Sequence, residues 1–325
     1  MKTKLAFLLL LPLTFMAVSC GANKNNSKSD ETPEEPPVVI PSKGPIDVVI
    51  ISGQSNGVGC SRHIYLADTM EEKYDEYCDG YPEIQIAYDC WTKTWPTPTS
   101  VGHERQNASP KSNFTKVALG QGNGRETFGP EVGIADKLMQ YKNEQDEKIY
   151  ANKVCIIKFA CGGSNLKDDW LALDSAMYPK LVEYVRTQMD HLKEKGFEPK
   201  IKAFCWMQGE GDPYSGYYQY YLANLRTFVA NVRNEFRDLT ANNEDIAFID
   251  ACISSSSEWQ YYKQVNEAKA SFATESERNI YIDTIAAGMH TNMEPPGSPD
   301  GYHYDSDSEI LLGYLFAEAF IPFLS

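Results

Sequence analysis

The chain of 325 residues is short of positive charge. It carries 30 Lys and Arg residues against 45 Asp and Glu residues, which gives a formal net charge of −15 at pH 7. A surface this acidic repels both the phosphates of nucleic acids and anionic lipid headgroups. The composition therefore predicts no nucleic-acid partner, and no membrane binding through the folded part of the chain.

Metal-ligand spacings and internal repeats are missing as well. The eight Cys and five His residues are not spaced like zinc ligands, and no segment recurs at a fixed period. We therefore expect neither a metal ion nor a cofactor. Apart from Cys20, the cysteines in apolar, strand-like runs are predicted to be buried thiols: Cys155, Cys205 and Cys252. The others leave a disulfide open without indicating which thiols pair: Cys60, Cys78, Cys90 and Cys161.

The sequence also lacks an apolar run long enough to cross a bilayer comfortably. Its longest run, Leu5 to Val18, follows Lys2 and Lys4, as in a secretory signal peptide. The run ends where a small residue precedes Cys20, which resembles a bacterial lipoprotein processing site. Residues 1–19 are thus predicted to be a lipoprotein signal peptide, and Cys20 the lipidated first residue of the mature chain. Ordinary cleavage and secretion remain the alternative, because Ala17 stands where Leu is usual.

Two regions follow this leader. Residues 20–44 are rich in Asn, Ser, Lys, Glu and Pro and cannot bury enough apolar surface to fold alone. They are predicted to be a flexible tether that holds the protein at a periplasmic or cell-surface membrane through the lipid anchor only. Residues 45–325 are long enough for one substantial domain.

The pattern of residues 45–325 alternates between strands and helices. Segments with helical apolar spacing, such as 181–192 and 222–236, separate five β-branched runs. These runs are Ile46–Ile51, Lys153–Phe159, Ile201–Trp206, Ile246–Asp250 and Asn279–Asp283. Strands that are apolar on both faces, alternating with amphipathic helices, predict a three-layer α/β/α domain with a five-stranded, mainly parallel sheet. Ser306 to Glu309 is a capping-box pattern that predicts the start of the last helix.

One stretch, residues 60–128, breaks this alternation. It is long, rich in tyrosine and interrupted by Gly, Pro and Asn, and only residues 84–87 are strand-like. Connections of this size in compact domains are usually functional. We therefore expect the stretch to form a wall of the active site.

Four polar motifs follow predicted strands, where open parallel sheets bind their ligands. The first places Ser55 between Gly53 and Gly57, a turn that can expose a nucleophilic hydroxyl and present a backbone N–H to an oxyanion. The second, residues 161–165, contains Gly163, which lets another N–H approach that oxyanion. Each motif alone is more often an ordinary turn.

The third and fourth motifs supply further polar groups. Residues 206–212 include Gln208, whose uncharged amide can stabilise an oxyanion, although Glu210 and Asp212 also suit a merely structural loop. In the fourth motif Asp300 precedes His303 by three residues, which lets the carboxylate orient the imidazole as a general base. The rival base is His290, which has no carboxylate nearby in the sequence before Glu294.

Together the motifs resemble the SGNH-hydrolase superfamily, and specifically its sialate O-acetylesterase-like branch with carbohydrate esterase family 6 and its acetylxylan esterases. The resemblance covers residues 46–320. It rests on Gly53-Gln54-Ser55-Asn56, Gly129-Pro130-Glu131, Lys158 to Gly163, Trp206 to Asp212, and Asp300 with His303. Gly57 stands where this branch commonly has Met, which predicts a wider pocket floor.

The resemblance implies a flavodoxin-like SGNH fold and a carbohydrate O-acetylesterase that needs no metal or cofactor. Ser55 would be the nucleophile, His303 the base and Asp300 its partner, with Glu210 as the alternative partner. The oxyanion hole would consist of Ser55, Gly163 and Gln208, supported by Gln54, Asn56 and Glu210. The aromatic residues predicted beside the site are Trp91, Trp95, Trp170, Tyr214, Tyr217 and Tyr302. Two other functions remain open: a glycan-binding lipoprotein without turnover, and an esterase for acyl chains longer than acetyl.

Overall fold

The computed structural model describes residues 44–325 apart from residues 98 and 111–112. The predicted signal peptide, the lipidated Cys20 and the tether up to residue 43 lie outside the described residues. Within the described part of the chain, no helix combines the length and the apolar character needed to cross a membrane.

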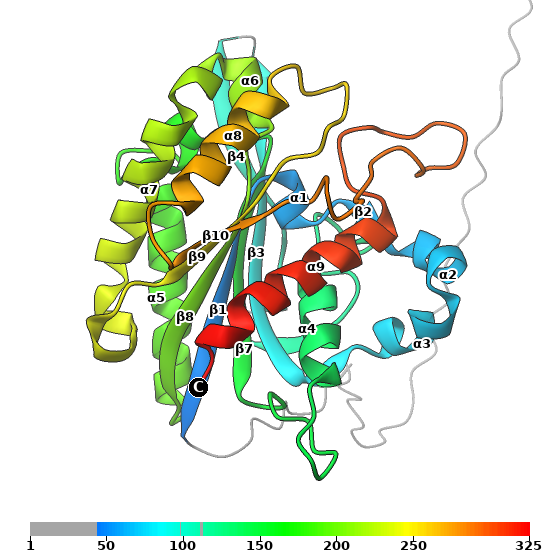
Figure 1. Ribbon diagram of the computed structural model, residues 1–325, viewed down its shortest axis with the longest axis vertical. Helices are drawn as coiled ribbons and strands as arrows, with labels where there is room; N and C mark the ends of the chain where they lie inside the picture. Colours follow the sequence, from blue (N-terminus) through cyan, green and yellow to red (C-terminus); the bar gives the residue numbers. More distant parts are fainter. Residues whose placement is uncertain (1–43, 98, 111–112) are drawn as a thin grey trace, which may run out of the picture. The chain divides into compact units, whose positions relative to one another are not determined.

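The core of the fold is an eight-stranded sheet in the order β10-β9-β8-β1-β7-β3-β4, with β5 paired to β3 (Figure 1). Its strands are β1 (Pro45–Gly53), β3 (Tyr81–Thr97), β4 (Ser100–Ala108), β5 (Thr115–Val117), β7 (Val154–Gly162), β8 (Glu198–Met207), β9 (Ala247–Ala251) and β10 (Asn279–Ile282). A separate antiparallel pair joins β2 (Ser61–Arg62) to β6 (Thr127–Phe128). The central strands β1 and β7 are buried almost throughout, as expected for strands covered on both faces.

The prediction of a five-stranded sheet is wrong, because residues 60–128 contribute three further strands. The five predicted strands are all present and run parallel to their neighbours. From residues 60–128, β3 joins β7 in parallel, while β4 and β5 pair with β3 in antiparallel fashion. Strand β4 is the sheet edge and largely polar, so it carries none of the apolar signal of a central strand.

Helices cover both faces of the sheet. The helices are α1 (Ser55–Val58), α2 (Leu66–Thr69), α3 (Glu71–Asp79), α4 (Glu131–Gln140), α5 (Tyr178–Glu194), α6 (Gly211–Ser215), α7 (Tyr221–Glu235), α8 (Tyr262–Ala273) and α9 (Ser306–Phe320). Figure 1 shows α4 and α9 on one face and α5, α7 and α8 on the other. The described domain therefore has the three layers that the alternating pattern predicts.

Helix α9 begins at Ser306, as predicted, but without the capping box. Asp305 precedes the helix and its side chain makes no capping hydrogen bond, while Glu294 Oε2 accepts the N–H of Ser306 at 2.8 Å. The Ser306 hydroxyl instead donates to Glu294 Oε1 at 2.6 Å, while Glu309 is fully buried. The motif located the helix, yet its side chains bind groups outside it.

The sheet topology determines where the site lies. Strand β1 sits between β7 and β8, so the chain crosses from one side of β1 to the other when it passes from β7 to β8. At the carboxyl end of β1, Gly53 is paired with Ala160 of β7 and with Met207 of β8. The loops after these three strands therefore meet at a topological switch point, the usual ligand position in such folds.

Candidate active site

The turn after β1 depends on Gly53. Its φ is +140°, and an added Cβ would lie 2.0 Å from the carbonyl oxygen of Met207, so no other residue fits without moving β8. Gln54 then donates its backbone N–H to the same Met207 oxygen at 2.8 Å. Helix α1 begins at the next residue, Ser55, whose N–H therefore belongs to the helix end that has no intrahelical acceptor.

A cavity of about 750 Å³ opens over this turn. Its walls bring together most of the predicted site residues: Gln54, Ser55, Gly163, Glu210 and His303. The stretch of residues 60–128 contributes to the wall as expected, through Cys60, Thr92, Lys93, Trp95, Val101 and Asn123. Gly57 does not line the cavity, and an added Cβ there would face the backbone oxygens of Ser52 and Met207. The expected widening of the pocket floor at Gly57 is therefore wrong.

His303 is held by the carboxylate three residues before it. Its Nδ1 lies 2.8 Å from Asp300 Oδ2, and Asp300 Oδ1 accepts the backbone N–H groups of Tyr302 and His303. Burial raises the pKa of Asp300, but the side-chain and backbone hydrogen bonds from His303, its charge and the backbone N–H of Tyr302 together leave that pKa below its usual range. This arrangement fixes the proton on Nδ1 and leaves Nε2 as the basic nitrogen.

The environment of His303 makes its imidazole strongly basic. Burial lowers the pKa of His303, but the hydrogen bond to Asp300 and the neighbouring Cys60 thiol raise it by more, to about 11. Cys60 and His303 line the same cavity as Ser55. In its neutral form, an imidazole with this affinity can take up the proton of a hydroxyl group that attacks an ester.

Asn56 connects the serine turn to the loops around it. Its Nδ2 donates to Glu210 Oε1 at 2.9 Å, and its Oδ1 accepts the backbone N–H of Tyr304 at 3.1 Å. Burial raises the pKa of Glu210, and the hydrogen bond from Asn56 offsets this only in part. Among the described residues, Glu210 makes no hydrogen bond to His303, so Asp300 is the carboxylate in contact with the imidazole.

Gln54 and Gln208 form a buried network beneath the cavity. Gln54 Oε1 accepts the backbone N–H groups of Gly209 and Gly211 and the side-chain amide of Gln208. Gln208 Nε2 also donates to Asp212 Oδ2 at 2.7 Å. Both amide hydrogens of Gln208 are thus engaged, and its side chain is fully buried and outside the cavity lining. The structure brings Gln208 near the other site residues without aiming it at their cavity.

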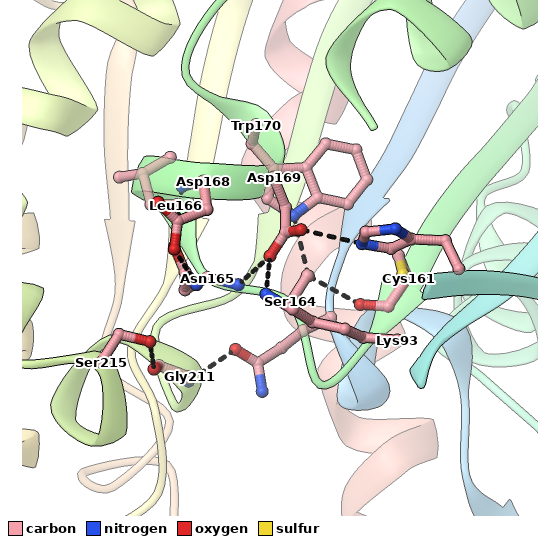
Figure 2. Close-up of polar contacts among 12 residues, drawn as sticks. Lys93, Cys161, Ser164, Asn165, Leu166, Asp168, Asp169, Trp170, Gly211 and Ser215 are labelled. Atoms are coloured by element: carbon pink, nitrogen blue, oxygen red, sulfur yellow. Dashed lines mark hydrogen bonds and ion pairs between the residues drawn. The ribbon is translucent and has the colours of Figure 1, made fainter. Parts of the chain in front are cut away.

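The loop after β7 carries the second predicted oxyanion donor. Gly163 has a φ of +70° and lines the cavity, and an added Cβ on the preceding Gly162 would lie 3.8 Å from Ser55 Cβ. Ser164, shown in Figure 2, donates to the Cys161 carbonyl oxygen at 2.7 Å and accepts the indole N–H of Trp170. These bonds hold the glycine turn rigidly beside the serine.

One charged cluster at the cavity wall is not apparent in the sequence. Lys93 Nζ lies 2.8 Å from Asp169 Oδ2, and His103 Nε2 lies 2.8 Å from Asp169 Oδ1 (Figure 2). Burial raises the pKa of Asp169, but the bonds from His103 and Lys93 lower it by more, to below its usual range. The three residues come from β3, β4 and the turn after β7, so no spacing along the chain indicates their contact.

A second charged pair lies beneath α1. Lys158 Nζ is 2.7 Å from Glu131 Oε2, both side chains are fully buried, and Lys158 also donates to the Val58 carbonyl oxygen at 2.9 Å. Burial lowers the pKa of Lys158, but attraction to Glu131 raises it by more. The pair therefore joins β7 and the start of α4 to the last residue of α1.

The predicted aromatic residues divide between the cavity and the core. Trp95, Tyr214 and Tyr302 line the cavity and are exposed, by 61%, 69% and 41%. Trp170 is buried and packs edge-on against Trp206. Two others do not line the cavity: Trp91 and Tyr217.

The rival base, His290, lies elsewhere. Its Nδ1 is 2.6 Å from Asp305 Oδ2, so it has a carboxylate partner that the sequence analysis missed because the two residues are fifteen positions apart. Burial lowers the pKa of His290, but the bond to Asp305 and the charges of Asp307, Asp305 and Glu294 together raise it by more. His290 lines a different cavity, which contains no predicted nucleophile.

The described part of the chain contains neither a disulfide nor a group of side chains placed to hold a metal ion. All seven cysteines of the described residues are free thiols, and Cys155, Cys205 and Cys252 are buried as predicted. Within residues 44–325 as described, no group of three or more His, Cys, Asp and Glu side chains is placed to hold a metal ion.

Comparison with known proteins adds one family and one fold. Residues 45–322 match the family described as "Carbohydrate esterase, sialic acid-specific acetylesterase". The solved structure of NanS aligns over 87% of this chain and 99% of its own, with 15% identity and a TM-score of 0.53. A carbohydrate acetylesterase from Xanthomonas citri aligns over 84% of this chain and 55% of its own, with 13% identity and a TM-score of 0.48. A comparison with curated proteins gave no match. The likeness to NanS shows that the two chains share a fold.

Proposed function

Because the chain belongs to the sialic acid-specific acetylesterase family of carbohydrate esterases, we propose that it removes acetyl groups from glycans through Ser55, His303 and Asp300. Family membership makes it an acetylesterase, a carboxylic-ester hydrolase. The observation that supports this mechanism is the placement of Ser55 and His303 in one cavity, with Asp300 on the Nδ1 side of the imidazole at 2.8 Å. In this proposal Nε2 is the nitrogen that takes the proton of Ser55.

The proposed reaction has two halves. Ser55 Oγ attacks the acetyl carbonyl carbon while His303 Nε2 takes its proton, and the tetrahedral oxyanion then collapses. The bond to the sugar oxygen breaks, and that oxygen leaves with the proton from His303. Water then attacks the acetyl-serine, again losing a proton to His303, and acetate leaves as Ser55 regains its proton.

Two backbone amides are proposed as oxyanion donors. The N–H of Ser55 lies at the open end of α1, and Gly163 follows β7 on the same cavity wall. Gln208 supports them from below, because its amide hydrogens go to Gln54 and Asp212. In this proposal Gln208 positions the loops and leaves direct oxyanion contact to the two amides.

The test is acetate release from O-acetylated glycans by the purified protein and by its Ser55→Ala variant. We expect release by the wild type and a loss of at least about a thousandfold in kcat for the variant, with an unchanged thermal unfolding midpoint as the control for folding. An acetyl ester and an octanoyl ester of the same chromophore separate an acetylesterase from an enzyme for longer chains. Activity retained by Ser55→Ala would contradict the assignment of the nucleophile.

A further inference from the structure

We infer that Asp168 and the paired cations of the cavity restrict the substrate to uncharged acetylated sugars and disfavour sugars that carry a carboxylate. This inference rests on the proposed function, since it concerns the sugar held in the same cavity. The inferred preference for uncharged sugars differs from the sialic acid named in the description of the family.

The cationic side chains that line the cavity are already neutralised. Lys93 is buried, with its Nζ 2.8 Å from Asp169 Oδ2, and His303 is paired with Asp300 at 2.8 Å. Among the described residues, the cavity lining contains no other Lys, Arg or His side chain. Recognition of a sugar carboxylate usually uses a free Arg or Lys with unpaired hydrogen-bond donors. The described lining of this cavity offers none.

The acidic side chains of the described lining, in contrast, are hydrogen-bonded to neutral groups. Asp168 is exposed and accepts only from neutral donors, the Asn165 side-chain amide at 3.0 Å and the Tyr217 hydroxyl at 3.3 Å. Glu210 is buried and bonded to the Asn56 amide. Neither takes part in a salt bridge within the described residues. A substrate carboxylate would therefore meet negative charge without compensation.

Aromatic rings complete a surface suited to a neutral sugar. Trp259 lines the cavity and is edge-on to Tyr214 at 5.9 Å and to Tyr302 at 5.4 Å between ring centroids. On the β3–β4 hairpin, the ring of Trp95 reaches to within 3.6 Å of the point where a Cβ on Gly163 would lie. The exposed rings of Trp95, Tyr214 and Tyr302 provide apolar faces against which the C–H face of a sugar can pack, and Trp95 lies beside the predicted oxyanion glycine.

The sharpest test changes the charge of the substrate and nothing else. Acetate release is measured with an O-acetylated sialic acid and with the methyl ester of the same sugar, which lacks the carboxylate charge. We expect kcat/KM at low ionic strength to be at least about tenfold higher for the methyl ester, and the ratio to fall as salt screens the repulsion. An acetylated neutral oligosaccharide should behave like the methyl ester and show little dependence on salt.

Matched variants assign the effect to Asp168. Asp168→Asn should raise kcat/KM for the acid about threefold or more while leaving the methyl ester within about twofold. Asp174→Asn changes the net charge equally at an exposed residue outside this cavity, and it should alter neither substrate. Circular dichroism of each variant checks that the fold is intact.

The outcomes separate the inference from the proposed function on which it rests. Equal rates for the acid and its methyl ester, or a preference for the acid, would overturn the inference while leaving the esterase mechanism in place. A ratio that Asp168→Asn and Asp174→Asn change alike would remove Asp168 from it. If the wild type releases acetate from neither sugar, nor from p-nitrophenyl acetate, the proposed function fails and takes the inference with it.

Discussion

The proton affinity of His303 is set by two side chains at the cavity. Asp300 binds Nδ1, and the Cys60 thiol is its other close neighbour. Together they outweigh burial and raise the pKa of His303 to about 11. A base of high pKa accepts a proton readily, but it keeps that proton up to high pH, and only the neutral imidazole can start the reaction.

The activity should therefore rise with pH at values above the pKa of an ordinary histidine. Because His303 must lose its proton first, kcat/KM should increase with pH through a limb whose midpoint lies above 6.5, the usual histidine pKa. Cys60→Ala removes one of the groups that raise this pKa, so the limb should move to lower pH. Cys78→Ala, an exposed thiol that does not line the cavity, is the control. A limb that stays in place in Cys60→Ala would contradict this account.

Trp95 provides a prediction on sugar recognition. Its exposed ring lies beside Gly163 on the cavity wall. Packing of an aromatic ring against the face of a sugar stabilises the bound sugar by about 1 kcal/mol. Trp95→Ala should lower kcat/KM for an acetylated oligosaccharide at least about fivefold, mainly through KM. Hydrolysis of ethyl acetate, which has no sugar, should be almost unchanged. Equal losses on both substrates would show that Trp95 supports the fold or the chemistry instead.

How far the site was predictable depends on how local each contact is. Asp300 and His303 are three residues apart, so their spacing already indicated the contact that the structure contains. The side-chain amide of Gln208, by contrast, donates to Gln54 in the turn after β1 and to Asp212 in its own loop. No sequence pattern indicates that both of its amide hydrogens already have acceptors. Lys93 and Asp169 are 76 residues apart and meet only because a polar hairpin joins the sheet.

At the level of elements, a buried ion pair fixes the short helix that carries Ser55. Helix α1 has only four residues, too few to be stable alone. Lys158 of β7 binds both the Val58 carbonyl oxygen at the end of α1 and Glu131 at the start of α4. The pair therefore ties the serine turn to the sheet and to a long helix.

A double-mutant cycle on this pair is the corresponding test. Glu131→Gln leaves the Lys158 ammonium buried without its counter-ion, and Lys158→Met does the same to the Glu131 carboxylate; each should lower the free energy of unfolding by about 3–5 kcal/mol. The double variant buries no unpaired charge and should lose clearly less than the sum of the two. Urea unfolding measures the cycle. Losses that simply add would mean that the two charges do not stabilise one another.

Element prediction succeeded where burial leaves a pattern and failed where it does not. Four of the five predicted strands, β1, β7, β8 and β9, lie inside the sheet and are largely buried, so their sequences indicate them directly, while β10 pairs with β9 at one edge. The edge strand β4 reads Ser-Val-Gly-His-Glu-Arg-Gln-Asn-Ala and needs no apolar face, because one side of it borders solvent. Its antiparallel pairing with β3 is part of the tertiary structure, and the local sequence does not indicate it.

At the scale of the whole molecule, the negative net charge favours the same uncharged sugars that we infer for the cavity. The chain carries a net charge of −15, and the cavity shares this sign through Asp168 and Glu210. Long-range repulsion would slow the approach of polyanionic glycans, whereas a neutral glycan is unaffected. We therefore expect the preference for uncharged sugars to weaken with salt for both reasons at once.

The last prediction concerns how the acidic body is held at a membrane that it would otherwise avoid. We propose that the chain is exported and that Cys20 carries the lipid, because the apolar run after Lys2 and Lys4 ends at this cysteine and a polar tether follows it. Because anionic lipid headgroups repel a protein with this much negative charge, its attachment to the membrane should depend on the lipid on Cys20. In a bacterial host, wild-type protein should incorporate labelled palmitate and sediment with membranes. Cys20→Ala should do neither yet keep its acetylesterase activity in the soluble fraction, whereas membrane sedimentation of this variant would point to another mode of attachment.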